Sequence, residues 1–268
     1  MNAPEPLTFA ALDGLAFAAA RGRLNGESDV PALTAASLGP LIEWTALSAA
    51  GLLPPVERTP SLSLNGTAPL MAAVRSRRGQ WICPKTQAAG VHRTMASLPE
   101  DDTAWVEFGL AAQKAAAAAG FPRQIAAQLV GAMMEMVSNI YEHSHDTGSG
   151  IVVFRAGVDA FEFVIADSGI GVRESLRGCA DYRDIADDGT ALQLALREGV
   201  SRFGRMANRG HGFRPIFVGL ANLSGLLRFR SGDHALVIDG QRIDMMLART
   251  AQKTPLGGFL ASVSCKLP

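Results

Sequence analysis

The sequence predicts an α+β protein: a two-layer α/β sandwich with helices on one face of a largely antiparallel sheet, preceded by a smaller, mostly helical α/β region. Two observations support this prediction. Helical and β-rich segments are mixed along residues 98–268, and the β-rich runs occur as close pairs, which favours antiparallel neighbours. Residues 1–97 are richer in Ala, Leu and Pro than the rest of the chain, which indicates a separate region.

The elements of the N-terminal region are short. Residues 32–53 predict a helix, which a Pro-Pro pair ends. Residues 61–64 alternate polar and apolar side chains, as in a short strand, and residues 69–77 favour a second helix. The region contains no catalytic motif, and we interpret the isolated His92 as a surface or packing residue. We expect a sensory or partner-binding region of unknown type.

The elements of residues 98–268 are better defined. Predicted helices are 101–119, 123–143, one near 191–198 and 215–223, and predicted strands are 151–155, 161–166, 226–230, 235–238 and 259–267. The first two strands are expected to be antiparallel neighbours, and the next two to form a hairpin around residues 231–234. Apart from its one helix, the stretch 169–212 is predicted to be irregular.

The composition argues against several classes of protein. Basic and acidic residues number 25 each, so the net charge is zero, and we predict no nucleic-acid and no membrane binding. No apolar run reaches the roughly 18 residues that span a bilayer. No basic residue precedes the best apolar run, residues 7–20, so we expect no secretory leader. The three cysteines lie far apart, which predicts no zinc or disulfide framework and favours the cytoplasm.

The predicted helix 123–143 has two faces. Its apolar stripe consists of Leu129, Met133, Met136 and Ile140. Its polar stripe consists of Glu135, Ser138, Asn139 and Glu142. Glu135 and Asn139 are therefore neighbours one turn apart, and Asn has a poor propensity for helix interiors. These two residues are either a functional pair or part of the solvent-exposed face of an amphipathic helix.

A second candidate segment follows a predicted strand. The apolar run 161–166 leads directly into Asp167 and the spaced glycines Gly169 and Gly171. An Asp at a strand end can accept a hydrogen bond from a ligand amine, and glycines let a ligand approach the backbone. The alternative is a plain turn, because Asp-Ser-Gly is ordinary turn composition.

A third segment contains Gly210 and Gly212, followed by Phe213, Arg214 and Pro215. Glycines before a Pro and an apolar run predict a loop that opens a helix. The free N–H groups of such a helix start favour phosphate, and Arg214 adds positive charge. The alternative is a flexible loop before a capped helix.

Together, the order and spacing of the three segments resemble the nucleotide-binding domain shared by histidine kinases, gyrase, certain chaperones and mismatch-repair proteins. Residues 255–268 resemble that family's last glycine box and closing strand. The resemblance covers about residues 100–268. It is closest to bacterial anti-sigma-factor kinases, in which the motif helix often continues from the Asn into a Glu-His pair, here Glu142 and His143.

The resemblance implies a Bergerat ATP-binding fold with ATP and Mg²⁺ as cofactors. By this analogy Asn139 is the Mg²⁺ ligand and Glu135 the general base. Asp167 accepts a hydrogen bond from the adenine amino group, which favours ATP over GTP. Gly169 and Gly171 let the base and sugar approach the backbone.

The remaining cofactor-binding residues implied by the resemblance are His143, Gly210, Gly212, Phe213 and Arg214. The two glycines wrap the phosphates, and residues 172–209 form a mobile lid. Phe213 and Arg214 depart from the small Gly and Leu run that is usual in the family, which bears on turnover more than on binding.

The function implied is that of a nucleotide-dependent regulator that phosphorylates a Ser or Thr of a protein partner, or sequesters that partner. One alternative is an ATPase that drives conformational change. Another is a protein-binding module with a degenerate nucleotide pocket. A protein partner is expected, and a homodimer is left open. A complete sensor histidine kinase is not expected, because no phosphoacceptor-histidine helix pair precedes the domain.

Overall fold

The computed structural model describes residues 3–24, 26–76, 78–95, 103–196, 225–239 and 249–267. The chain divides into two compact units, residues 1–77 and 78–268. This boundary lies earlier than the sequence boundary at 97/98. The reason is that β4 (Gln80–Ile82) and β5 (Ala89–Arg93) belong to the sheet of the second unit, where β5 pairs with β6 (Ile151–Gly157).

The first unit alternates strands and helices. Its elements are β1 (Glu5–Pro6), α1 (Phe9–Ala20), β2 (Leu33–Thr34), α2 (Leu38–Ala49), β3 (Leu62–Ser63) and α3 (Ala68–Arg75), with 3-10 turns at Glu27–Asp29 and Val56–Arg58. The three strands are parallel, in the order β1-β2-β3. The helix predicted over residues 32–53 corresponds to α2, which is shorter because Leu33 pairs with Leu62 in the sheet. Trp44 is buried in α2, and its indole N–H donates to the Pro54 carbonyl at 2.8 Å.

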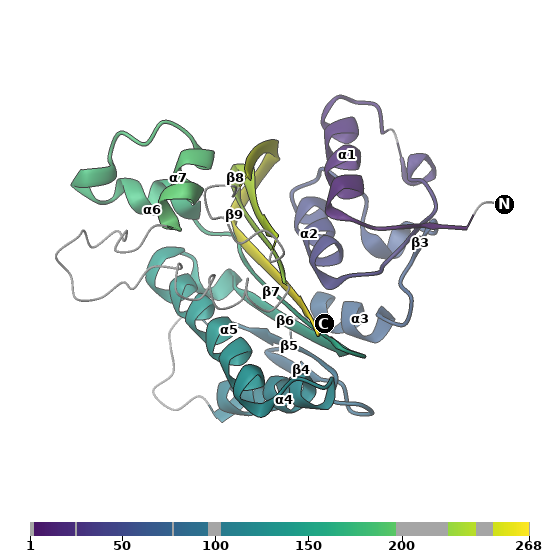
Figure 1. The fold of residues 1–268 in the computed structure, drawn as a ribbon. Coiled ribbons are helices and arrows are strands. Elements are labelled where there is room, and N and C mark those ends of the chain that lie inside the picture. The colour runs from purple at the N-terminus through teal and green to yellow at the C-terminus, as the bar shows by residue number, and fades with distance from the viewer. Residues whose placement is uncertain are drawn as a thin grey trace. The chain divides into compact units, whose positions relative to one another are not determined.

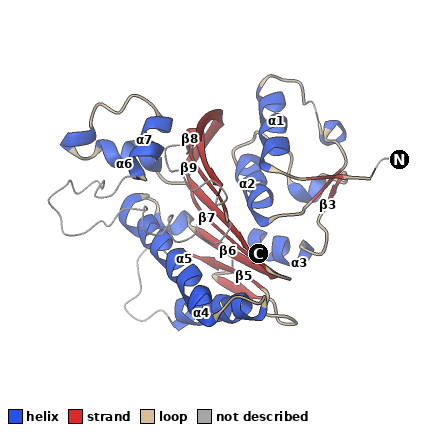
Figure 2. Cartoon of the chain, in the orientation of Figure 1, coloured by secondary structure: helices blue, strands red, loops and turns tan. Residues whose placement is uncertain are grey.

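The second unit is built on a six-stranded antiparallel sheet, so the protein is a mixed α+β protein (Figures 1 and 2). The strands lie in the order β4-β5-β6-β7-β9-β8. The bounds of the last three are β7 (Ala160–Asp167), β8 (Leu226–Asp239) and β9 (Arg249–Lys266). The predicted antiparallel pairing of the strands at 151–155 and 161–166 is confirmed, from Ile151–Ala166 to Gly157–Ala160.

Two helices, α4 (Thr103–Ala118) and α5 (Arg123–His143), pack on one face of this sheet (Figure 1). The predicted helix 123–143 is confirmed, and its apolar stripe is buried. Small side chains such as Ala112 and Ala116 let α4 lie close to the sheet. The rings of Phe108, Phe154, Phe161 and Phe163 follow one another through the core, with centroids 5.2, 6.1 and 6.3 Å apart.

The stretch after β7 is more regular than the sequence predicted. It contains α6 (Gly171–Arg177), a 3-10 turn at Ala180–Tyr182, and α7 (Asp188–Ala195). Leu176, Ile185 and Ala191 form a small core of their own, which lets these short helices persist. The helix predicted near 191–198 begins earlier because the Asp187 carboxylate caps it, accepting from the Thr190 N–H at 2.7 Å. The predicted helix 215–223 lies outside the described residues.

The hairpin predicted around residues 231–234 is wrong: β8 is one continuous strand paired with β9. The turn-like residues form a bulge instead, with register shifts between Ser231 and Gly232 and between Gly232 and His234. Gly232 has a φ of +57°, which suits glycine. Because β9 is long enough to pair on both sides of the bulge, β8 does not need to turn back on itself.

No helix of the described residues is long and apolar enough to cross a membrane.

The packing of helices on the central sheet can be tested by substitution of a buried side chain. Phe163 in β7 is fully buried, so Phe163→Ala is expected to lower the free energy of unfolding by about 3 to 5 kcal/mol. Val158 lies at the tip of the β6–β7 turn and is 91% exposed, so Val158→Ala is the control, with a change within about 0.5 kcal/mol. Denaturant unfolding measures both. Similar values for the two variants would contradict this packing.

Candidate functional site

The helix α5 carries the three predicted site residues Glu135, Asn139 and His143. Glu135 is exposed, and the other two are half-buried. The side-chain amide of Asn139 donates to the Glu135 carbonyl at 2.9 Å. This contact orients the amide and leaves its oxygen as the atom that can face a cation. His143 Nε2 lies 3.8 Å from the Glu142 carboxylate.

Asp167 is the last residue of β7, where the strand leaves the sheet. Its Oδ1 accepts a hydrogen bond from the Gly169 N–H at 2.8 Å. Burial raises the pKa of the Asp167 carboxyl to about 6, against the smaller, opposing effect of hydrogen bonds from the Gly169 and Phe259 backbone, and the charge of Asp146 adds to the rise. Such a group can exchange a proton near neutral pH, a property that is common at functional sites.

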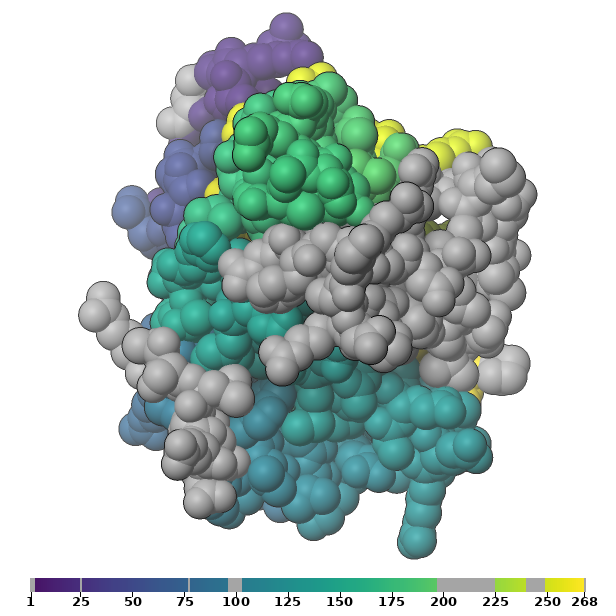
Figure 3. Space-filling model, turned by 90° about the vertical axis from the view of Figure 1, so that its left-hand side faces the viewer, coloured from purple at the N-terminus to yellow at the C-terminus, as the bar shows by residue number. Residues whose placement is uncertain are grey.

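The segment after Asp167 is held against the end of α5. The Ile170 N–H donates to the Ser144 carbonyl, just beyond α5, at 2.9 Å. A Cβ added to Gly169 would lie 2.1 Å from the same carbonyl oxygen, so only glycine fits. Residues that are far apart in the sequence therefore meet here, and α6 follows directly in contact with α5. Figure 3 shows α6 and α7 as one green surface next to the teal surface of the preceding helices.

Ser231, which lies in the segment predicted to be the turn of a hairpin, completes this arrangement. The Ser231 hydroxyl of β8 accepts from the Val172 N–H at 2.9 Å and donates to the Gly258 carbonyl at 3.1 Å. A Cβ on Gly258 would lie 2.0 Å from the Asp167 carbonyl oxygen. The local sequence carried no signal for this role of Ser231, because Ser-Gly-Asp composition is typical of turns.

The predicted residues Gly210, Gly212, Phe213 and Arg214 lie outside the described residues. Among the residues that the structure does describe, no group of three or more His, Cys, Asp or Glu is arranged to hold a metal ion. Mg²⁺ beside a nucleotide keeps several waters and takes only one or two protein oxygens, so a neutral oxygen such as that of the Asn139 side chain can serve as a single protein ligand. The half-buried Asp167 carboxylate can accept hydrogen bonds from N–H groups.

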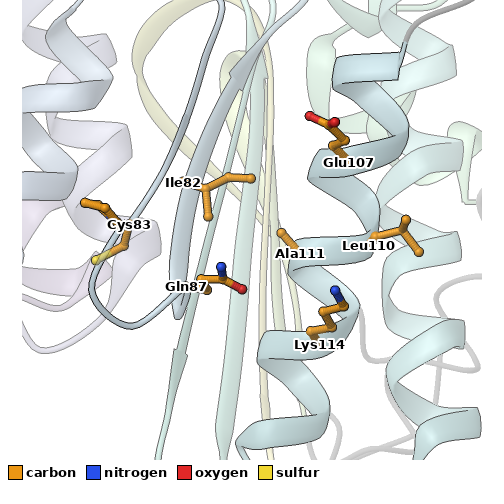
Figure 4. Close-up of a pocket in the computed structure, with 8 residues that line it drawn as sticks. Ile82, Cys83, Gln87, Glu107, Leu110, Ala111 and Lys114 are labelled. Carbon is orange, nitrogen blue, oxygen red and sulfur yellow. The ribbon is translucent and has the colours of Figure 1, made fainter.

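A separate groove of about 330 Å³ lies between α4 and the β4–β5 hairpin (Figure 4). Its main lining side chains are Ile82, Gln87, Glu107, Leu110, Ala111 and Lys114. Glu107 and Lys114 lie two turns apart on α4, so the groove has an acidic end and a basic end with apolar groups between them. No local sequence pattern indicates this groove, because its two walls are brought together only by the fold.

Comparison of the chain with protein-family models, with curated proteins and with solved structures finds no match in any of the three.

The raised pKa of Asp167 predicts a pH-dependent cost in stability. The folded protein binds this proton more tightly than the unfolded chain, so the free energy of unfolding falls as the pH rises from about 4 to about 6. Above pH 6 the loss is complete, and Asp167→Asn is expected to be more stable than wild type at pH 7 by roughly 1 to 3 kcal/mol. Near pH 4 the difference should vanish.

Urea unfolding at several pH values measures this effect. Asp159→Asn, at an exposed position in the β6–β7 turn, is the matched control and should show no such pH-dependent gain. An Asp167→Asn protein that is less stable than wild type at pH 7 would show that the carboxylate is not held at a cost.

Proposed function

We propose that residues 78–268 form an ATP- and Mg²⁺-binding domain of the histidine kinase-like type, and that the protein is a nucleotide-dependent regulator. The observation that carries the proposal is the meeting of three segments around Asp167: the end of α5, the glycines after β7, and Gly258 of β9. These are three of the four segments in which the sequence resembles that family; the fourth, with Gly210 and Gly212, lies outside the described residues. The antiparallel sheet with α4 and α5 on one face is compatible with a Bergerat fold.

Each side chain has a distinct role in this proposal. The Asp167 carboxylate accepts a hydrogen bond from the exocyclic amine of adenine, and this bond is strongest when the carboxylate is ionised. Asn139 contributes a neutral oxygen to Mg²⁺, and the bound ion neutralises phosphate charge. Glu135, one helical turn before Asn139, is the general base that takes the proton from an attacking hydroxyl. Gly210, Gly212, Phe213 and Arg214 are proposed to lie beside the phosphates.

The proposed activity is transfer of a phosphoryl group to a Ser or Thr of a protein partner, as in the anti-sigma kinases, or nucleotide-controlled sequestration of that partner. Steady hydrolysis of ATP by the purified protein alone would favour the alternative of an ATPase. A general base predicts that Glu135→Gln keeps nucleotide affinity but lowers phosphoryl transfer or hydrolysis by about 100-fold or more.

Calorimetric titration with ATP tests the site itself. With Mg²⁺ present, wild type should bind ATP in preference to GTP, and Asp167→Asn and Asn139→Ala should each weaken binding at least tenfold, about 1.4 kcal/mol. Because a protonated carboxyl is a weaker acceptor for the adenine amine than a carboxylate, affinity should fall as the pH drops through about 6. Asp167→Asn should also lose this pH dependence.

Matched controls separate the site from general damage to the fold. Gln128→Ala is on the exposed face of the same helix as Asn139, and Asp159→Asn repeats the Asp-to-Asn change at the opposite end of β7 from Asp167. Both should bind ATP as wild type does. If wild type produces no heat and ADP causes no thermal shift, the proposal of a nucleotide site fails.

The groove on α4 favours a second candidate function, that of a protein-binding module. Val106 and Leu110 beside it are 55% and 52% exposed, which is unusual for large apolar side chains on a helix. The charges at the groove's two ends complement an extended peptide with a basic residue, an apolar pair and an acidic residue. Seven helical residues span about 10 Å, as do three extended peptide steps.

Titration with two blocked tetrapeptides, Lys-Leu-Leu-Glu and its charge-reversed counterpart Glu-Leu-Leu-Lys, tests this candidate. The first peptide should shift the NMR signals of α4 at lower concentration than the second, and Leu110→Asp should weaken its binding at least fivefold. Equal binding of both peptides, or binding that is unaffected by Leu110→Asp, would remove the groove as the site of recognition.

A further inference from the structure

Ser231 makes hydrogen bonds to two elements that are distant in sequence from it and from each other. It lies at the bulge of β8 and is only 2% exposed. Its hydroxyl accepts from the Val172 N–H of α6 at 2.9 Å and donates to the Gly258 carbonyl of β9 at 3.1 Å. One hydroxyl can do both, because it has one proton to donate and lone pairs to accept.

The hydrogen bond that Ser231 accepts from the Val172 N–H gives α6 an N-terminal cap, which the residue before the helix does not provide. The first N–H groups of any helix have no partner within the helix, and no side chain of the residue before α6 caps it. Ser231 provides that cap from another strand, so the start of α6 is fixed by the sheet and not by its own sequence. Removing the hydroxyl would leave the N–H and the carbonyl without these partners, at a cost typical of buried polar groups.

The glycines around Ser231 leave almost no room for adjustment. Gly171 has a φ of +76°, and a Cβ there would lie 2.7 Å from the Ser231 Oγ and 3.2 Å from the Gly258 carbonyl oxygen. A Cβ on Gly258, whose φ is +75°, would lie 2.0 Å from the Asp167 carbonyl oxygen. The backbone at the Asp167 carbonyl and at Gly171 is therefore packed against the groups that Ser231 joins.

The same bulge holds the next helix. The Asp188 carboxylate at the start of α7 accepts from the Asp233 N–H at 3.2 Å, and a Cβ on Gly232 would lie 2.0 Å from that carboxylate. The bulge residues 231–233 thus contact the starts of both α6 and α7. Of the two contacts, only the one through Ser231 reaches the segment that begins at Asp167.

We infer that Ser231 is a positioning residue of the nucleotide site: its hydroxyl holds the start of α6 against β8 and β9, and so holds the loop Asp167–Gly171 in the geometry that receives the base. This inference rests on the proposed function. Ser231 does not itself touch the nucleotide, so its effect on binding is exerted through the backbone of α6 and of Gly258.

Two measurements on Ser231→Ala test the inference separately. Without nucleotide, hydrogen exchange of the α6 amides, that of Val172 above all, should accelerate about tenfold, as expected for one lost hydrogen bond. With ADP and Mg²⁺, affinity should fall about tenfold. The pH midpoint of ADP binding should also rise, because a looser loop weakens the Gly169 N–H bond that favours the Asp167 carboxylate.

Two further variants accompany it. Ser262→Ala removes an equally buried serine of β9, placed opposite Val164 and Arg228, and should change neither α6 exchange nor the pH midpoint. Ser231→Cys keeps the size of the side chain with weaker hydrogen bonding and should fall between wild type and Ser231→Ala, which provides a test if the alanine variant does not fold.

The outcomes separate the inference from the proposed function. Unchanged exchange in α6 shows that Ser231 does not hold the helix, and overturns the inference. Faster exchange with unchanged ADP affinity and pH midpoint assigns Ser231 a structural role only, and also overturns it. If wild type binds no ADP, the proposed function and the positioning role fail together, while the exchange rates still report whether Ser231 holds α6.

Discussion

β7 and β9 are hydrogen-bonded along the whole of β7, from Ala160 opposite Lys266 to Asp167 opposite Phe259. Their last pair lies where Gly258 passes within contact distance of the Asp167 carbonyl. This pairing decides where β7 ends, and therefore where its terminal carboxylate stands. It also carries β8 along the outer side of β9, which brings the bulge at Ser231 to the start of α6.

Burial of the Asp167 carboxylate costs free energy when the group is ionised, and this cost bears on the role of the residue. A carboxylate at the end of a strand could lie in water, yet here burial outweighs two backbone hydrogen bonds and raises its pKa. A protein that needed this residue only as a turn former would be served equally well by Asn or Ser. A buried ionisable group of this kind is common at functional sites, which makes Asp167 a candidate binding residue.

The two candidate surfaces of the second unit differ in how they are built. The one at Asp167 is constructed from backbone contacts and glycines, which leave little room for the backbone to adjust. The groove beside α4 is lined by longer side chains, with Glu107 and Lys114 at its ends, and suits a peptide whose side chains can adjust. In the proposed regulator, the first surface would bind the nucleotide and the second would be available to a protein partner.

Periodicity in the sequence was enough to predict α5 and the pairing of β6 with β7, because both depend on local spacing and on a short connection. It was also enough to single out Asn139, Asp167 and Gly169 as candidates, since helix propensity and strand-end glycines are local properties.

Local sequence patterns could not predict the features that are made by distant contacts. The residues at 231–234 have turn composition, but pairing with the long β9 turned them into a bulge. Likewise α6 forms because its apolar side chains meet those of α7 and because Ser231 caps its start. The sequence by itself therefore determined α5 and the pairing of β6 with β7, and it named the candidate residues, because these depend on neighbours along the chain. Only the tertiary structure decided that the ends of α5, β7 and the middle of β9 converge, because the backbone contacts of Ile170 with Ser144 and of Gly258 with Asp167 join separate segments and leave no mark on local composition.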